Sequence, residues 1–470
     1  MTLPEEVVPQ RLVIVVPTTA EFDSRTYRIA SGLAARGHEV TVMGRLKAGL
    51  AADERHAAGY RIRRVPVSAI DGLPFPGLVR ALRTTVRRFY AWRTGTPFRP
   101  VPPAGSATTG SGQAAGRSVQ EGPGTLESAT PAADKGASLP RRAAADLVRR
   151  LAIPLQIRSQ LRQTRRVAPP ADLYHGMAYM GIPIALDLAR RHRASVVYDA
   201  RDIYLEAANL ARMRGPARRL LARAERGWAR RADRVVTVNR PYAEVMASRF
   251  GVELPLIVMN CSYRNQPREP RERRFHDVLG LPAERRVVLY QGGFSRDRGI
   301  EQLLAAIPEV PNATLVLMGY GYLEDEIRSR AADPAIRERV AVLPAVPPTE
   351  LLDWVAGADV VAMPIQPTTL NHRLTTPNKL FEAMAAGVPV VASDLPGMAP
   401  IVGEVDCGVL VDPTDPHAIA AACRLLLEES PEAAAQRRAR ILRAAHDAYN
   451  WEGQLDVLLA EYGRLTGKPW

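Results

Sequence analysis

The fold is indicated by one stretch near the start of the chain, "RLVIVVPTTAEFDSRTYRIASGLAARGHEVTVMG", residues 11–44. It opens on an apolar run rich in β-branched residues (11–17), continues through a segment with helical periodicity (25–37) and ends on a second β-branched run (38–44). Strand, helix, glycine turn and strand in this order predict a βαβ unit. Such a unit implies a parallel sheet that is covered by helices on both faces.

The same alternation continues outward and divides the chain into two halves. In the first half, further strands are predicted at 172–177, 195–200, 233–239 and 255–261. In the second half, strands are predicted at 286–293, 313–319, 340–346, 359–365 and 408–413, with helices between them. We therefore predict an α/β protein with two Rossmann-like, doubly wound domains that face each other across a cleft.

The domain boundaries follow from a polar, proline-containing junction at 264–274. The N-terminal domain is predicted at 1–265 and the C-terminal domain at 275–430. The helices of 431–470 are expected to pack back on the N-terminal domain. Residues 94–140 consist mostly of Gly, Ser, Ala, Thr and Pro, so a disordered insertion is predicted there.

The composition restricts the class of protein. The 470 residues are 46% hydrophobic and 24% charged, as in an ordinary globular protein. No apolar run approaches the ~20 residues of a membrane span. The acidic start "MTLPEEVVPQ" has no signal-peptide pattern, so a cytoplasmic protein is expected. The scattered Cys261, Cys407 and Cys423 predict neither a disulfide nor a metal site.

The net charge of +14 has two interpretations. An anionic partner is one, but an arginine bias of the coding sequence explains the charge as well, and nucleic acid is not expected as a partner. Two basic amphipathic stretches, 78–93 and 147–166, are either surface helices or a peripheral contact with an anionic membrane. The four lysines among the 63 basic residues are Lys47, Lys135, Lys379 and Lys468.

Ligands of open parallel sheets bind beyond the carboxyl ends of the strands, so the loops at those ends are the candidate sites. The loop "YQGGFSRDRGIEQ" (290–302) carries a glycine pair, and its Arg298 begins the next helix, where an anion is favoured. The following loop, "GYGYLEDE" (319–326), brings two more glycines to the same edge.

A third loop lies in "TTPNKLFEAMAAGVPVVASD" (375–394). Thr376 is predicted to cap the helix and Pro377 to occupy its first position. A projection at 100° per residue places Asn378 and Glu382 opposite the core face. The core face consists of Leu380, Phe381 and Met384. An ordinary surface ion pair between Lys379 and Glu382 is the alternative.

Four stretches carry a resemblance to a known family. They are "TPNKLFEAMAAGVPVVASD", "YQGGFSRDRGIEQLL", "ADRVVTVNRPYAEVM" and "VVYDARDIYLE". Together they resemble the retaining GT-B glycosyltransferases of family 4, or group 1, over nearly the whole chain outside 94–140. The resemblance implies a nucleotide-sugar donor held mainly by the C-terminal domain and an acceptor held mainly by the N-terminal domain.

The resemblance also implies roles for individual residues. Glu382 matches the glutamate that accepts hydrogen bonds from the donor ribose, and Arg298 and Lys379 match contacts with the diphosphate. Arg298, Lys379 and His175 are the candidate catalytic residues. The other expected donor contacts are Gly292, Gly293, Gly319, Gly321, Thr376, Asn378 and Leu380, with the base near 344–346. Arg25, Arg201 and Asp202 are the expected acceptor-side residues.

The sequence departs from the family pattern at several positions. Leu374 stands where the family has a first glutamate that contacts the transferred sugar, and Asn371, His372 or backbone amides are the candidate replacements. Gly293 stands where an arginine is common, with Arg296 as its candidate replacement. The first loop, "PTTAEFDSRTYR" (17–28), lacks the family's glycine pair. His175 is retained without its usual partner histidine, so a buried structural histidine is an equal alternative to a catalytic one.

The expected activity is a metal-independent, retaining transfer of a hexose from a nucleotide diphosphate to a hydroxyl acceptor, lipid-linked acceptors included. Cell-envelope glycan, glycolipid or small-molecule glycoside synthesis is the expected setting, and no cofactor is expected. A nucleotide-sugar epimerase and a non-catalytic scaffold of a polysaccharide assembly are the alternatives. An epimer formed from donor alone, or binding without turnover, would distinguish them. The base, sugar, acceptor, linkage and oligomeric state are left open.

Overall fold

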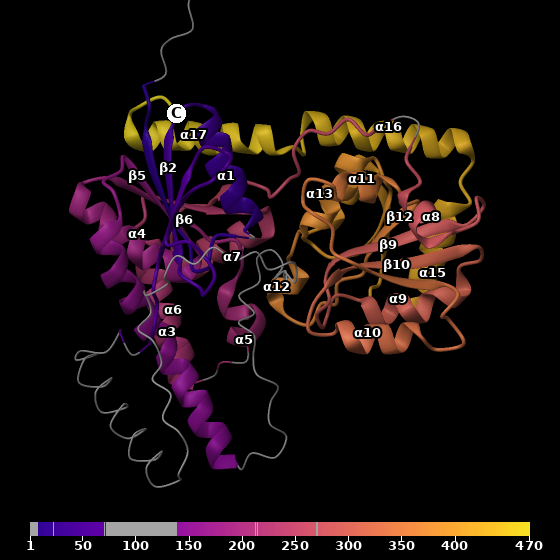
Figure 1. Cartoon of the computed structure of the whole chain (residues 1–470), viewed down its shortest axis with the longest axis horizontal. Helices are drawn as coiled ribbons and strands as arrows, with labels where there is room; N and C mark the ends of the chain where they lie inside the picture. The colour runs from indigo at the N-terminus through magenta and orange to yellow at the C-terminus, as the bar shows by residue number, and fades with distance from the viewer. Residues whose placement is uncertain are drawn as a thin grey trace, which may run out of the picture.

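The computed structural model describes residues 8–21, 23–69, 71, 139–211, 213, 215–268 and 271–470. Two α/β domains lie side by side, each built on one open sheet (Figure 1). The prediction of two Rossmann-like domains is therefore confirmed. The predicted insertion, 94–140, and the basic stretch 78–93 lie outside the described residues, except that 139–140 begin a helix.

The N-terminal domain contains an eight-stranded sheet in the order β3-β4-β2-β1-β5-β6-β7-β8. All neighbouring strands are parallel except β3 and β4. The strands are β1 (Arg11–Val15), β2 (Glu39–Arg45), β3 (Asp53–Arg55), β4 (Arg61–Val65), β5 (Leu173–Met177), β6 (Ser195–Asp199), β7 (Arg234–Thr237) and β8 (Leu256–Ile257). The order reverses between β1 and β5, and ligands of such sheets bind beyond the carboxyl ends of the strands at that point.

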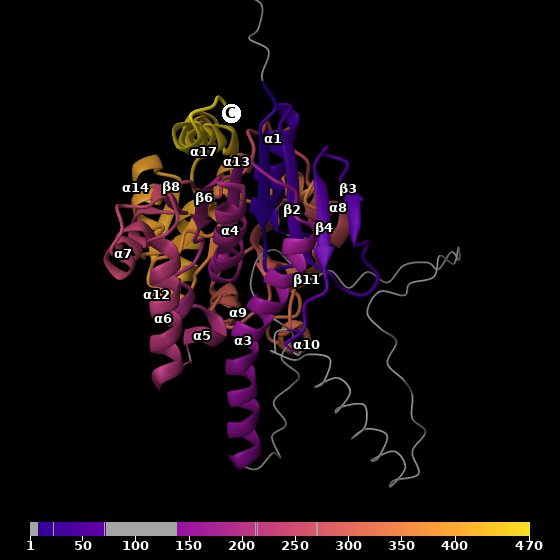
Figure 2. The same ribbon diagram turned by 90° about the vertical axis from the view of Figure 1, so that its left-hand side faces the viewer.

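Helices cover both faces of this sheet because its strands are apolar on both sides. On one face, Ile29 and Leu33 of the first helix pack with Ile14 and Val42. On the other face, three helices, α3, α4 and α6, lie beside one another (Figure 2). The helices of this domain are α1 (Ser24–Ala35), α3 (Leu139–Val167), α4 (Ala178–His192), η2 (Tyr204–Glu206), α5 (Ala208–Ala211), α6 (Gly215–Ala229) and α7 (Arg240–Phe250).

The C-terminal domain contains a six-stranded, fully parallel sheet in the order β11-β10-β9-β12-β13-β14. Its strands are β9 (Arg286–Gly293), β10 (Ala313–Tyr320), β11 (Val340–Pro344), β12 (Val360–Met363), β13 (Val390–Ser393) and β14 (Gly408–Val411). Its helices are α8 (Arg274–Leu279), α9 (Ile300–Ala306), η3 (Ile307–Glu309), α10 (Glu324–Ala331), α11 (Leu351–Ala356), α12 (Leu370–Arg373), α13 (Asn378–Ala386), α14 (Ala399–Val405) and α15 (Pro416–Leu427). Here the order reverses between β9 and β12.

Two long helices extend across both domains (Figure 1). They are α16 (Pro431–Asp447) and α17 (Trp451–Thr466). Ile441 and Ala445 of α16 are buried in the C-terminal core, whereas Trp451 and Leu458 of α17 are buried in the N-terminal core. The prediction that all of 431–470 packs on the N-terminal domain is thus wrong for α16, whose apolar stripe meets α13 and α14.

Two further elements differ from the prediction. The strand predicted at 255–261 is reduced to the two residues of β8, because the chain beyond it bonds to α17 instead: Met259 N donates to Gln454 Oε1 at 2.7 Å. The antiparallel pair β3–β4 was not predicted, although "RIRRV" (61–65) alternates as a strand does. Among the described helices, none is both long enough and apolar enough to span a membrane.

Candidate functional site

The loops that follow β9 and β10 lie with α13 at the carboxyl edge of the C-terminal sheet. In the described residues, no atom lies within 4 Å of where a Cβ of Gly293 would stand. A Cβ at Gly319 or Gly321 would instead collide with neighbouring backbone. Gly293 therefore borders open space, whereas Gly319 and Gly321 are explained by close packing of the chain.

Two cations, Lys379 and Arg298, lie together at this edge. Lys379 Nζ stands 3.7 Å from the centroid of the Tyr290 ring. Burial and the charge of Arg298 lower the pKa of Lys379 to about 7, and the charge of Glu382 opposes both effects. Arg298 Nε donates to Ser295 Oγ at 3.3 Å. Within the described part of the chain, neither cation forms an ion pair, so both positive charges remain without a bonded carboxylate.

Glu382 is partly buried beside these cations. Gln291 Nε2 donates to Glu382 Oε2 at 3.4 Å. Burial raises the pKa of Glu382, while the charges of Arg28 and Lys379 lower it. The surface ion pair considered for Lys379 and Glu382 is not found, since both residues are turned into the site rather than into solvent.

The N-terminal domain reaches this site through Arg28 of α1. Arg28 Nη1 donates to Asn260 Oδ1 at 2.9 Å, and Asn260 Nδ2 donates to Asn378 Oδ1 at 2.8 Å. Burial lowers the pKa of Arg28, and the charge of Glu382 raises it. The predicted donor residues Asn378 and Glu382 are therefore coupled to the opposite domain.

The packing of α13 follows the predicted projection, with Leu380, Phe381 and Met384 at most 1% exposed. The side chain of Leu380 therefore faces the core, and only its backbone is free to contact a donor. The predicted cap is wrong: Pro377 is the N-cap and makes no side-chain cap bond. Thr376 Oγ1 instead donates to the carbonyl of Gly397. This tertiary hydrogen bond takes the place of the predicted cap.

Residues 370–376 connect the two domains. Asn371 Oδ1 accepts from Ile203 N at 2.8 Å, and Asn371 Nδ2 donates to Asp202 Oδ1 at 3.1 Å. Leu374 packs against the N-terminal core, and its carbonyl accepts from Asn239 Nδ2 at 2.7 Å. Leu374, which stands where the family has its first glutamate, thus contributes to the domain interface in this chain.

His372 and Arg296, the two other candidate replacements, lie nearer to Arg298 than Asn371 does. His372 Nδ1 is 2.9 Å from Thr368 Oγ1. Burial lowers the pKa of His372, as does the charge of Arg298. Arg296 is exposed, and its backbone N donates to Tyr322 Oη at 3.0 Å. His372 thus lies near the loop between β9 and α9, to which Arg296 belongs.

His175 lies in the N-terminal core, away from this edge. It is 0% exposed, with Nδ1 2.6 Å from Tyr462 Oη and Nε2 3.2 Å from Asp199 Oδ2. Arg25, also 0% exposed, donates from Nε to the same oxygen at 2.6 Å. Burial and these bonds contradict the predictions that His175 is catalytic and that Arg25 contacts an acceptor, and they favour the structural alternative for His175.

The other acceptor-side candidates follow β6. Arg201 Nη1 donates to Asp23 Oδ1 at 2.7 Å, and Asp202 bonds to Asn371 as described above. These two residues are partly exposed and lie where the two domains meet. Asp202 therefore lies on the N-terminal side of the domain contact. The predicted donor-binding residues Asn378, Lys379 and Glu382 lie on the C-terminal side.

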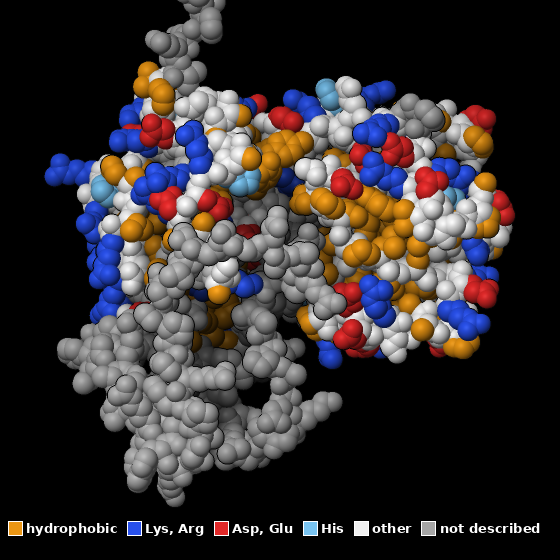
Figure 3. Space-filling model, in the orientation of Figure 1, with side chains coloured by type: hydrophobic (Ala, Val, Ile, Leu, Met, Phe, Trp, Pro, Cys, Tyr) orange, Lys and Arg blue, Asp and Glu red, His pale blue; other side chains and the backbone are white. Residues whose placement is uncertain are grey.

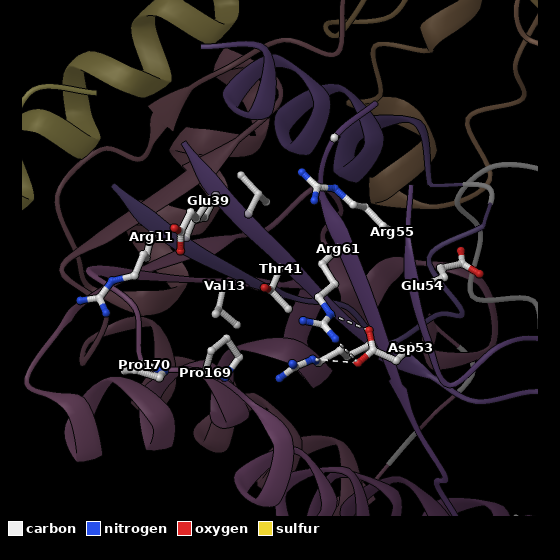
Figure 4. Close-up of a pocket in the computed structure, with 14 residues that line it drawn as sticks. Arg11, Val13, Glu39, Thr41, Asp53, Glu54, Arg55, Arg61, Pro169 and Pro170 are labelled. Atoms are coloured by element: carbon white, nitrogen blue, oxygen red, sulfur yellow. Dashed lines mark hydrogen bonds and ion pairs between the residues drawn. The ribbon is translucent and has the colours of Figure 1, made fainter. Parts of the chain in front are cut away.

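A groove of about 800 Å³ lies elsewhere, on the N-terminal sheet (Figure 4). Three of its four lining arginines are already paired: Arg61 and Arg63 with Asp53 at 2.6 and 3.3 Å, and Arg11 with Asp172 at 3.3 Å. A groove whose charges are mostly neutralised internally is a poor candidate for an anionic substrate. No group of three His, Cys, Asp or Glu residues that would hold a metal ion occurs in the described ranges.

Comparisons with known proteins agree with this geometry. Residues 285–429 match the family "Glycosyl transferases group 1", and residues 106–261 match the "Glycosyl transferase 4-like domain". Together these matches cover more than half of the chain. The chain belongs to the GT-B glycosyltransferases.

A curated relative, the D-inositol 3-phosphate glycosyltransferase of Xylanimonas cellulosilytica, is 29% identical to this GT-B chain over 251 residues, 50% of this chain and 58% of the relative. The chain spans about half the length of the curated relatives it matches.

Solved structures share the GT-B fold over nearly the full length. Sucrose-phosphate synthase from Thermosynechococcus elongatus has a TM-score of 0.66 and 18% identity, over 97% of this chain and 99% of that one. Anabaena Alr3699/HepE in complex with UDP and glucose has a TM-score of 0.62 and 14% identity, over 97% and 100%. At these identities the likeness shows the fold alone.

Several residues of the GT-B site were missed by sequence reasoning. Arg28, Asn260 and Asn239 belong to the opposite domain, and no spacing in the sequence indicates that they reach α13 or the segment before it. Tyr290 and Gln291 precede the glycine pair by two positions and one position, so their place near the end of β9 was the available signal.

Proposed function

We propose that this chain transfers a hexose from a nucleotide-diphosphate sugar to a hydroxyl acceptor, with retention of configuration and without a metal ion. The observation that carries the proposal is the site of Arg298 and Lys379, two cations that form no ion pair in the described part of the chain. A diphosphate supplies the missing negative charges. Glu382, an acceptor-only group beside them, suits the two hydroxyls of a ribose.

In this proposal, catalysis is mainly electrostatic. As the bond between the anomeric carbon and the diphosphate oxygen breaks, Arg298 and Lys379 stabilise the negative charge that develops on the diphosphate. The acceptor hydroxyl attacks on the face from which the diphosphate leaves and passes its proton to a phosphate oxygen. Closure of the two domains around both substrates excludes water and protects the donor from hydrolysis.

The setting of the reaction is also a proposal. We place it at the cytoplasmic side of the cell envelope, with glycolipid, glycan or small glycoside products and lipid-linked acceptors included. Blue side chains gather along the left edge of the N-terminal domain (Figure 3), the side on which α4 lies, and α4 ends in the exposed Arg190, Arg191 and Arg193. These arginines and the exposed Arg158 and Arg166 of α3 support a peripheral contact with anionic lipid.

The ligands of solved structural neighbours support a nucleotide-sugar donor. Alr3699/HepE has been solved with UDP and with UDP-glucose, and the curated relatives include D-inositol 3-phosphate glycosyltransferases and glycogen synthases. These relatives differ in their acceptors, so the donor is the substrate to test first.

The proposal is tested by calorimetric titration of UDP, GDP and dTDP into the full-length chain. We expect one nucleotide to bind and Glu382→Ala to weaken it roughly 10- to 100-fold, because hydrogen bonds to a charged group contribute about 1.5–3 kcal/mol. Glu338→Ala, which changes an exposed glutamate of the same domain, should leave the affinity unchanged. If none of the three nucleotides binds, or if Glu382→Ala binds as the unmodified chain does, the donor site is wrongly assigned.

Nucleotide binding should also depend on pH. Since the pKa of Lys379 is lowered to about 7, the free site loses this positive charge as the pH rises from 7 to 9, and a bound diphosphate raises the pKa again. We therefore expect affinity to fall over this range, with proton uptake on binding, measured as a dependence of the heat on the buffer's ionisation enthalpy. Lys379→Arg keeps its charge throughout and should abolish the uptake; an equal uptake in that variant would exclude Lys379 as its source.

The two alternative functions give different results in the same samples. An epimerase would convert the sugar of the bound donor without an acceptor, which NMR detects as a new anomeric signal. A scaffold would bind nucleotide without releasing it from any donor. Release of the nucleoside diphosphate only when an acceptor is present supports the transferase.

A further inference from the structure

Arg28 of α1 is a partly buried cation without a bonded carboxylate. Its Nη1 donates to Asn260 O at 3.1 Å and to Asn260 Oδ1 at 2.9 Å. Its guanidinium carbon lies 6.0 Å from the centroid of the Tyr263 ring. Among the described residues, Arg28 forms no ion pair, and its Nε and Nη2 bond to no acceptor. Cations withdrawn from water are usually balanced by an anion, so a nearby negative charge is expected for Arg28.

The two segments that pass between the domains meet at Arg28. One segment is 258–273, between β8 and α8, and its Asn260 accepts the bonds just described. The other is the junction of α16 and α17, where Trp451 Nε1 donates to Arg28 O at 3.3 Å. Trp451 N also donates to Ser262 O at 2.8 Å, which ties the two segments together. Arg28 is therefore fixed at the point where the chain crosses from one domain to the other.

Asn260 connects Arg28 to the donor face of α13. Its Nδ2 donates to Asn378 Oδ1 at 2.8 Å. Glu382 follows Asn378 by four positions, so the two side chains lie on the same face of this helix. Burial raises the pKa of Glu382, and the charge of Arg28 lowers it by more than that of Lys379 does. The bond chain from α1 thus ends beside the carboxylate on which Arg28 acts.

Glu382 is the anion that balances Arg28. The other groups that face Arg28 are the phenol of Tyr263, the thiol of Cys261 and the guanidinium of Arg25. Burial raises the pKa of both the phenol and the thiol, so neither carries a negative charge near neutral pH. On the side of Glu382, the remaining groups are Lys379 of its own helix and the neutral amide of Gln291 from β9.

We propose that Arg28 is a positioning residue for Glu382, so that the nucleotide site of the C-terminal domain is complete only with this side chain of the N-terminal domain. A nearby cation keeps a carboxylate ionised. The ionised form accepts hydrogen bonds from both ribose hydroxyls, whereas a carboxylic acid carries a proton that must itself be donated. The proposal rests on the proposed transferase function and deepens it, because nucleotide affinity then depends on the opposite domain.

The test is calorimetric titration of the nucleotide that binds best among UDP, GDP and dTDP into the full-length chain, between pH 5 and 6.5. Lys379 keeps most of its positive charge in this range. Acidification protonates Glu382 and weakens binding. Arg28→Gln removes the cation, so we expect the pH at which affinity falls to rise by about one unit, the lower end of the effect of a close opposite charge. An unchanged pH profile would overturn the proposal.

Three further variants complete this test. Arg28→Lys keeps the charge and should restore the profile of the unmodified chain. Arg36→Gln is the matched control, because Arg36 is an exposed arginine of the same helix, paired with Asp456 at 2.6 Å; its profile should not move. Asn260→Ala frees the guanidinium and should shift the profile in the same direction as Arg28→Gln. It keeps the proposal testable if Arg28→Gln does not fold, since an unchanged profile there also counts against it.

A double-mutant cycle without nucleotide separates this proposal from the proposed function. Urea denaturation at pH 6.5 compares Arg28→Gln, Glu382→Gln and the double variant. We expect Arg28→Gln to cost less free energy of unfolding once Glu382 is replaced, because the charge that it balances is gone. Additive losses would show that the two side chains do not interact, even if nucleotide binds. Coupled losses without nucleotide binding would leave the link between Arg28 and Glu382 standing and refute the donor site.

Discussion

Replacing Lys379 by glutamine is expected to slow release of the nucleoside diphosphate from the sugar donor about 100- to 1,000-fold, the usual cost of removing one group that stabilises developing charge. The loss should appear mainly in kcat, because the charge on the diphosphate grows as its bond to the sugar breaks. The measurement is steady-state release of the nucleotide selected by calorimetry. Lys379 has the position for this role: its ammonium is held over Tyr290 with no bonded carboxylate to neutralise it.

Lys468→Gln is the control for this prediction. Lys468 is another of the four lysines, and it forms an exposed ion pair with Asp172 at 2.7 Å. Removing an exposed pair changes little, so turnover should stay as in the unmodified chain. Equal turnover in Lys379→Gln would show that the diphosphate does not leave past this lysine.

Replacing Trp451 by alanine is expected to lower the free energy of unfolding of the N-terminal domain by about 3–5 kcal/mol, the range for large aromatic residues in a core. Trp451 is 0% exposed and is among the largest fully buried side chains. Its backbone N donates to Ser262 O at 2.8 Å, and its Nε1 donates to Arg28 O at 3.3 Å. Urea denaturation followed by far-ultraviolet circular dichroism measures the change.

Val457→Ala provides the comparison on the same helix. Val457 is 41% exposed, so its truncation removes little buried surface and should cost less than about 1 kcal/mol. Similar losses for the two variants would mean that α17 is not part of the N-terminal core.

The repeating elements were the most predictable part of the fold. β9 occupies the predicted residues 286–293, because its apolar run ends at a glycine pair that stops the strand. α13 shows its predicted core face, since helical periodicity depends only on local spacing. α16 was misplaced for a tertiary reason: its periodic apolar residues show that it packs against something, without showing which domain.

The candidate site was predictable only within one domain. Gly293, Arg298, Lys379 and Glu382 stand near strand ends, where topology alone brings loops together. The Arg28 and Asn371 contacts cross between domains, and only the three-dimensional arrangement reveals them. His175 was ambiguous because a motif identifies a residue type, whereas Asp199 and Tyr462, which occupy its two nitrogens, are distant in the sequence.

The position of α17 has a consequence for synthesis of the chain. The N-terminal sheet is complete in sequence by β8, yet one wall of its core is provided by residues 451–466, which the ribosome adds after the whole C-terminal sheet. The usual order, in which domains fold from the N-terminus as they emerge, is therefore reversed for the last step. The C-terminal sheet has its full complement of strands while α1 of the first domain still lacks Leu455, which packs on its Gly32. A nascent chain arrested before residue 451 should therefore bind holding chaperones through that uncovered face.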